Sequence, residues 1–153
     1  MEPTNQNAIT LLEKELVAVL KEEYSFYQSL YVLLDKQRDL IRYEKDDKLL
    51  DLFAEVERCH LRIRQSEEKI RALQQKHPRL FKLAAVSPDI RKIVNSIVTL
   101  VKKSAALVAE NEEYMRNRHD RIKVELDELK NSHKIMQYIQ TGTPSAQFVD
   151  GKR

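Results

Sequence analysis

Residues 49–73 read LLDLFAEVERCHLRIRQSEEKIRAL, and this stretch decides the fold class. Its apolar positions step alternately by three and four residues, which places them on one face of an α-helix. The positions are Leu49, Leu52, Val56, Cys59, Ile63, Ser66, Ile70 and Leu73, with Ser66 as the one polar member. Such a seam predicts a helix over about 47–76 that packs in a hairpin or bundle. Cys59 lies on the seam, so it is interpreted as a small core residue.

A similar periodic pattern precedes this stretch and predicts a first helix over about 7–42. Its apolar positions are Ile9, Leu12, Leu16, Leu20, Tyr24, Tyr27, Tyr31, Leu34 and Ile41, widened by further apolar neighbours. A stripe this wide indicates burial against more than one neighbour. The polar segment 42–47 predicts a turn in which Asp46 or Asp47 caps the second helix. Since the segment has neither Gly nor Pro, a continuous helix stays open as the alternative.

The only internal break lies between Pro78 and Pro88, and we expect residues 77–87 to fold back over the end of the hairpin. After it, Ser87 as N-cap, Pro88 at the first helical position and Asp89 predict the start of a third helix. This helix extends over about 88–140 in our reading of the pattern.

The chain ends in a second breaker-rich stretch, because Gly142 and Pro144 follow the third helix. We expect residues 142–153 to form a flexible tail. The predicted fold is therefore all-α, with a long antiparallel helical hairpin and a very long C-terminal helix in one domain over 1–141.

The composition agrees with this fold. The 153 residues include 2 glycines and 4 prolines, and both glycines lie beyond residue 141. Hairpin turns and phosphate-binding loops need glycine, so sheet folds and nucleotide-cradling loops are excluded. With 42% hydrophobic residues the chain can form a core, and its single cysteine suits a reducing cytosol. No 18-residue apolar run or secretory signal occurs, so we expect a cytoplasmic protein without membrane insertion.

Catalytic and metal-binding patterns are missing. Glu57 and His60 form one Glu-x-x-His pair, whereas a di-iron bundle needs two such pairs and further inward carboxylates. No nucleophile motif or paired cysteines occur. We therefore expect no metal site, no cofactor and no enzymatic activity.

The charge is unevenly distributed along the chain. Residues 1–57 contain 13 acidic and 7 basic side chains, while residues 58–82 contain 8 basic and 2 acidic ones. The basic block lacks interleaved aromatic residues and any nucleic-acid-binding motif. We therefore favour charge complementarity between neighbouring helices over nucleic-acid binding.

The third helix carries two heptad phases that differ in composition. One is apolar throughout, at Val94, Val101, Val108, Met115, Ile122, Leu129 and Met136. The other starts apolar at Ile90 and Ile97 but becomes polar at Ser104, Asn111, Arg118, Glu125 and Ser132. We expect the first part to pack as a third core helix. Beyond Asn111 the apolar stripe of this helix is narrow. It binds a partner helix, or it contacts the back of the hairpin or a second copy of the chain, and these alternatives stay open.

Three features resemble one family. Residues 30–41 read LYVLLDKQRDLI and are followed, after an Asp-containing break, by LLDLF at 49–53. The second feature is the hairpin, Pro-containing joint and very long last helix, and the third is the tail motif FVDG at 148–151. On these grounds the chain resembles the FlgN family of flagellar type III export chaperones, whose members often have Tyr where this chain has Phe148.

The resemblance implies a function. Members are cytoplasmic, non-enzymatic chaperones that hold the C-terminal helices of the two hook–filament junction proteins until export. The last helix would bind the substrate protein through Val108, Met115, Ile122, Leu129 and Met136, and Phe148 would dock the tail on the export gate. No nucleic acid is expected as a partner, and a homodimer stays open. The alternative function is that of a self-associating coiled-coil scaffold.

Overall fold

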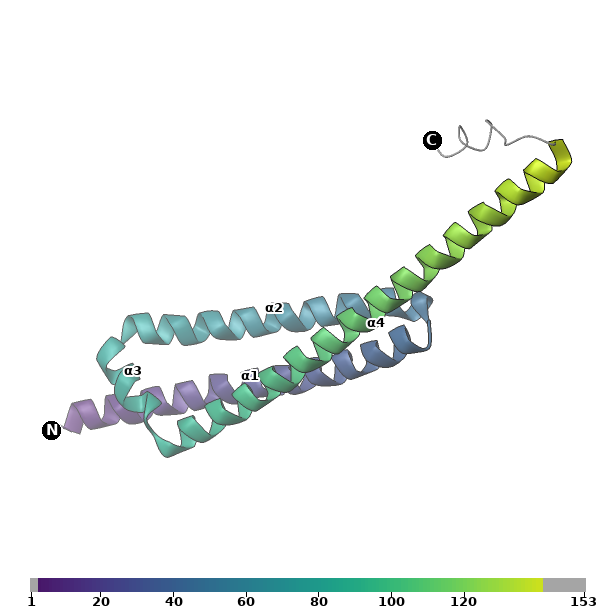
Figure 1. Ribbon diagram of the computed structural model, residues 1–153. Helices are drawn as coiled ribbons and strands as arrows, with labels where there is room; N and C mark the ends of the chain where they lie inside the picture. Colours follow the sequence, from purple (N-terminus) through teal and green to yellow (C-terminus); the bar gives the residue numbers. More distant parts are fainter. Residues whose placement is uncertain (1–2, 142–153) are drawn as a thin grey trace. The chain divides into compact units, whose positions relative to one another are not determined.

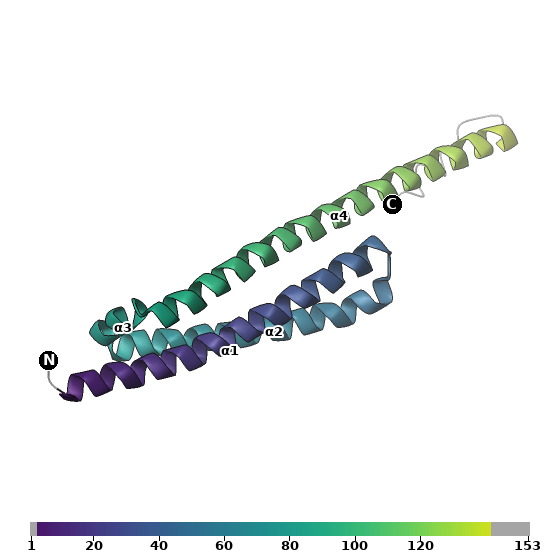
Figure 2. The ribbon, with the colours of Figure 1, turned by 90° about the horizontal axis from the view of Figure 1, so that it is seen from below.

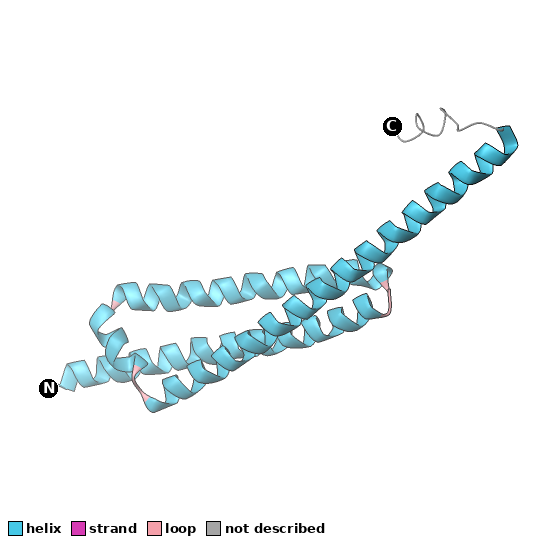
Figure 3. Cartoon of the chain, in the orientation of Figure 1, coloured by secondary structure: helices cyan, strands magenta, loops and turns pink. Residues whose placement is uncertain are grey.

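The computed structural model describes the backbone of residues 3–141 and the side chains of residues 6–141. Four helices follow one another: α1 (Pro3–Arg42), α2 (Asp46–Lys76), α3 (Pro78–Ala85) and α4 (Pro88–Thr141). The described residues consist of these helices and the short turns between them, without a strand (Figure 3). The predicted all-α class is therefore confirmed, while the predicted tail over 142–153 lies outside the described residues.

Two compact units make up the chain, Met1–Asn111 and Glu112–Arg153. The first contains α1, α2, α3 and the beginning of α4. In it, α1 and α2 lie side by side in opposite directions, and α3 lies at the end of this hairpin away from its turn (Figure 1, Figure 2). The hairpin expected from the sequence is therefore present. That residues 1–141 form a single domain stays a prediction.

The seam of α2 packs as its spacing predicts. Its members from Leu49 to Ser66 are all buried. The two non-hydrocarbon groups on the seam are satisfied by the backbone of α1. The Ser66 hydroxyl donates to the carbonyl oxygen of Val19 at 3.4 Å, and the Cys59 thiol donates to that of Phe26 at 3.1 Å. Because a buried polar group without a partner is costly, these contacts allow Ser and Cys in the core.

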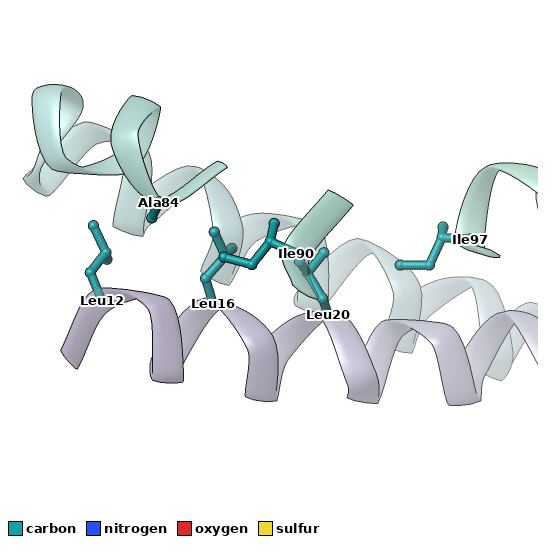
Figure 4. Close-up of a cluster of buried hydrophobic side chains, with 6 residues drawn as sticks. All are labelled: Leu12, Leu16, Leu20, Ala84, Ile90 and Ile97. Atoms are coloured by element: carbon teal, nitrogen blue, oxygen red, sulfur yellow. The ribbon is translucent and has the colours of Figure 1, made fainter. Parts of the chain in front are cut away.

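Two clusters of buried side chains form the core of the first unit. The first joins Leu12, Leu16 and Leu20 of α1 to Ala84 of α3 and to Ile90 and Ile97 of α4 (Figure 4). The second joins Leu30, Leu34, Val56, Cys59, Ile63 and Leu107. Since both clusters include α4, its first part is a third core helix, as expected.

The turn between α1 and α2 ends the first helix without glycine. Glu44 has a φ of +58°, in the left-handed region. The amide of Lys45 donates to the carbonyl of Leu40 at 2.8 Å, and the amide of Glu44 donates to that of Ile41 at 3.2 Å. This pair of bonds is a Schellman motif, in which the left-handed position is usually glycine. The turn thus breaks the helix at a sequence that contains no breaker.

Two local expectations were wrong. α1 begins at Pro3 rather than near residue 7, since Pro is tolerated in a first helical turn. The N-cap of α2 is Lys45, and Asp46 and Asp47 follow it in the first turn of the helix. Their negative charges there interact favourably with the positive end of the helix dipole.

Within the joint at 77–87, Pro78–Ala85 is helical. It does fold back onto the hairpin, because Ala84 is completely buried and Leu80 and Phe81 pack on the first core cluster.

We predict that Glu44→Gly raises the free energy of unfolding by about 1 kcal/mol, because glycine adopts positive φ without the Cβ clash of an L-residue. Chemical denaturation followed by circular dichroism measures the change. Glu44→Ala is the control, since it removes the same side chain but keeps the Cβ. Equal stability of the two variants would contradict the assigned turn geometry.

Candidate functional site

Of the two heptad phases of α4, the one that changes from apolar to polar residues along the helix packs inside the first unit. Ile90, Ile97, Ser104 and Asn111 follow at intervals of seven residues, and all four are buried. The buried face therefore continues through two polar residues up to the end of the first unit.

Asn111 closes this face with a buried polar contact. Its Nδ2 donates to the carbonyl oxygen of Leu34 at 3.2 Å and to Oε1 of Gln37 at 3.1 Å. Its Oδ1 has no hydrogen-bond partner among the described atoms, nor has the Ser104 hydroxyl. A buried amide of this kind adds little stability but favours one register of helix packing. Sequence reasoning did not find this contact, because its partners lie more than 70 residues away in α1.

The all-apolar phase of α4 lies exposed instead. In the first unit, Val94, Val101 and Val108 are each about 40% exposed. In the second unit the exposed fractions are 41% for Met115, 44% for Ile122, 66% for Leu129 and 59% for Met136. All five side chains expected to bind a substrate protein are thus accessible, and four of them belong to the second unit. Phe148 lies outside the described residues.

The second unit presents a narrow apolar seam. None of residues 112–141 is buried. We call the following residues the α4 seam, because they alternate by four and three: Met115, His119, Ile122, Leu126, Leu129, His133 and Met136. This is the spacing with which one helix packs against another in a coiled coil. Exposed apolar side chains in such a row are typical of a surface that binds a partner.

An apolar cavity of about 310 Å³ lies among the four helices of the first unit, and Arg91 and Asn95 are its only polar lining residues. Over residues 3–141 no three His, Cys, Asp or Glu side chains gather as a metal site. In the same range no helix has the length and hydropathy to cross a membrane.

The buried titratable groups lie within the hairpin core. Burial raises the pKa of the Glu23 carboxyl to about 7, with a further contribution from the charge of Glu67. Burial also raises the pKa of Tyr27, reinforced by Glu67 and Glu23. Burial raises the pKa of the Cys59 thiol, and Arg62 partly opposes this. The thiol therefore keeps the proton that it donates to Phe26, as expected for a core residue.

Charged side chains pair both between α1 and α2 and within single helices. Between the two helices, Lys69 and Glu22 form an ion pair at 3.3 Å. Within a helix, Arg71 pairs with Glu68 and Arg38 with Asp35. The opposite net charges of the two segments thus meet at this exposed pair.

Comparison with known proteins gives one match. The family model described as FlgN protein matches residues 9–146. No curated protein and no solved structure matches the chain.

The buried Glu23 gives a prediction for the pH dependence of stability. Between its ordinary pKa of 4.5 and its folded pKa of about 7, the folded chain retains a proton that the unfolded chain has lost. Stability should therefore fall as the pH rises through this window. We expect Glu23→Gln to remove this fall and to raise the free energy of unfolding by about 1 kcal/mol at pH 8.

Denaturation midpoints between pH 4 and pH 8 measure this effect. Glu15→Gln is the matched control, because it removes the same charge from an exposed position of α1. A pH dependence in Glu23→Gln that matches the unsubstituted chain would refute the assignment.

Proposed function

Because the chain belongs to the FlgN family of flagellar export chaperones, we propose that it binds the C-terminal helices of hook–filament junction proteins. It holds them in the cytoplasm, prevents their premature assembly and delivers them to the type III export apparatus. The proposed binding residues are Val108, Met115, Ile122, Leu129 and Met136 of α4. No enzymatic step is part of this function.

One observation carries the proposal: the apolar phase of α4 is exposed, at Val108 in the first unit and at Met115, Ile122, Leu129 and Met136 in the second. A terminal helix of a filament component is an assembly surface and associates when its apolar face is open. Covering that face on α4 removes apolar area from water, worth about 25 cal/mol per Å² before ordering costs. A seam interrupted by two histidines gives a reversible contact, which suits a chaperone that must release its client.

Delivery is the part that we assign to the tail. We propose that Phe148 docks on the export gate while α4 holds the client. The support is the family resemblance of the FVDG motif and the separation of this motif from the α4 seam along the chain.

A self-associating coiled-coil scaffold is the second candidate, favoured by the four-three spacing of the α4 seam. In that case the seams of two copies pair, and light scattering detects a concentration-dependent dimer without any client.

We predict that replacing Met115 and Ile122 together by Asp abolishes binding of a junction-protein C-terminal segment, because two carboxylates cannot be buried against an apolar helix. Isothermal titration calorimetry measures the affinity, and circular dichroism checks the helix content. The control is the pair Val124→Asp and Ile135→Asp, which places the same charges at exposed apolar positions on the opposite side of α4. Binding by the seam variant at the affinity of the control would contradict the site.

We predict that Phe148→Ala leaves client affinity unchanged and weakens binding to the cytoplasmic part of the export gate at least about tenfold, as for loss of a buried aromatic anchor. A pull-down with the loaded chaperone measures this. Phe148→Tyr serves as the control, since it retains the ring and should retain binding. Unchanged gate binding by Phe148→Ala would remove the tail from the delivery step.

A further inference from the structure

A row of positive charge follows one edge of the α4 seam. Arg116, Lys123 and Lys130 each come directly after a seam residue and repeat every seven residues. All three side chains are exposed. Within the described part of the chain, none of the three forms an ion pair. The helical period places all three beside the seam on the same side, and we call them the basic row.

The residues along the other edge of the seam do not share one sign of charge. Arg118, Glu125 and Ser132 occupy the equivalent heptad positions there. Asp120 and Asp127 follow Arg116 and Lys123 by four residues, but they lie farther from the seam than the basic row. Asp120 is directed at His119, with 3.8 Å between its Oδ1 and the histidine Nδ1. The row therefore presents three cations next to the apolar contact surface.

In paired helices, the residues that flank the apolar seam select the partner by opposite charge. We propose that the α4 seam receives a different helix whose apolar face is bordered, opposite the basic row, by carboxylates repeating every seven residues. This deepens the proposed function, since it rests on the α4 seam as the client site and states the chemistry of the client helix. A nucleic acid matches the cations but has no apolar face for Ile122 or Leu129.

A second copy of the chain is a poor occupant by the same reasoning. Antiparallel pairing of two seams places the basic row against itself, so that like charges face each other. Parallel pairing places Lys123 opposite Arg118 and Lys130 opposite Glu125, which gives one repulsion and one attraction. Charge therefore adds nothing to self-association, whereas an acidic flank gains from all three cations.

The test uses two designed peptides of about 28 residues, or four heptads. Both have the same leucine and valine seam, and the flanking positions are all Glu in one and all Lys in the other. We expect the full chain to bind the Glu peptide at least about tenfold more tightly at low salt, with the difference shrinking as salt screens the flanks. The triple variant Arg116→Glu, Lys123→Glu, Lys130→Glu should reverse the preference.

The matched control is Arg58→Glu, Arg64→Glu, Lys76→Glu on α2, which changes the net charge equally at exposed positions of another helix. It should keep the preference for the Glu peptide. Equal binding of the two peptides, binding of neither, or the same reversal in the α2 control overturns the proposal. So does a dimer of the chain that is dissociated by Met115→Asp and excludes both peptides.

A junction-protein C-terminal segment, titrated in parallel, separates this inference from the proposed function. If the segment fails to bind while the peptide preference holds, the client assignment is wrong and the basic row still selects an acidic helix. If the segment binds the unsubstituted chain and the triple variant equally, the function stands and the basic row does not select the client.

Discussion

A helix can bury only one face against a hairpin, and α4 carries two heptad phases that compete for that face. The phase through Ile90, Ile97, Ser104 and Asn111 is buried, although half of these residues are polar. The phase with an apolar residue at every step is left exposed. Within the first unit, the accessible surface of α4 therefore follows from this choice, since the apolar side chains of Val94, Val101 and Val108 are exposed.

The polar members of the buried phase are tolerated because of groups that only the folded chain brings together. Asn111 reaches the backbone of Leu34 and the amide of Gln37 across the interface between α4 and α1. Ser66 and Cys59 use backbone carbonyls of α1 in the same way. Each of these buried donors thus has an acceptor, and the Gln37 side chain ties Asn111 to one register of α4 on α1, because a side-chain acceptor does not recur at every turn.

The sequence predicts those parts of the fold that depend on local periodicity. The seam of α2, the hairpin and the start of α4 at Pro88 follow from spacing and capping residues within a few turns. The turn at 42–47 was predicted, but the left-handed conformation of Glu44 could not be, because a glutamate has no preference of its own for positive φ. Nor could the burial of Asn111, whose partners are remote in sequence. The candidate binding residues follow from the seven-residue apolar repeat of α4. Their exposure could not be predicted from the repeat, because the same spacing also suits a buried face.

Two kinds of interaction contribute to the proposed site, namely apolar contact along the α4 seam and charge pairing at its edges. In the proposed complex, apolar contact along the α4 seam would supply most of the binding free energy, but it would discriminate poorly, because any amphipathic helix offers leucines at the same spacing. Charge at the edges adds little affinity in water and imposes a large difference between matched and mismatched partners. An export chaperone works among many helices that assemble through apolar faces, including its own. A basic row beside a narrow seam would let it remain unpaired with itself and still accept an acidic client.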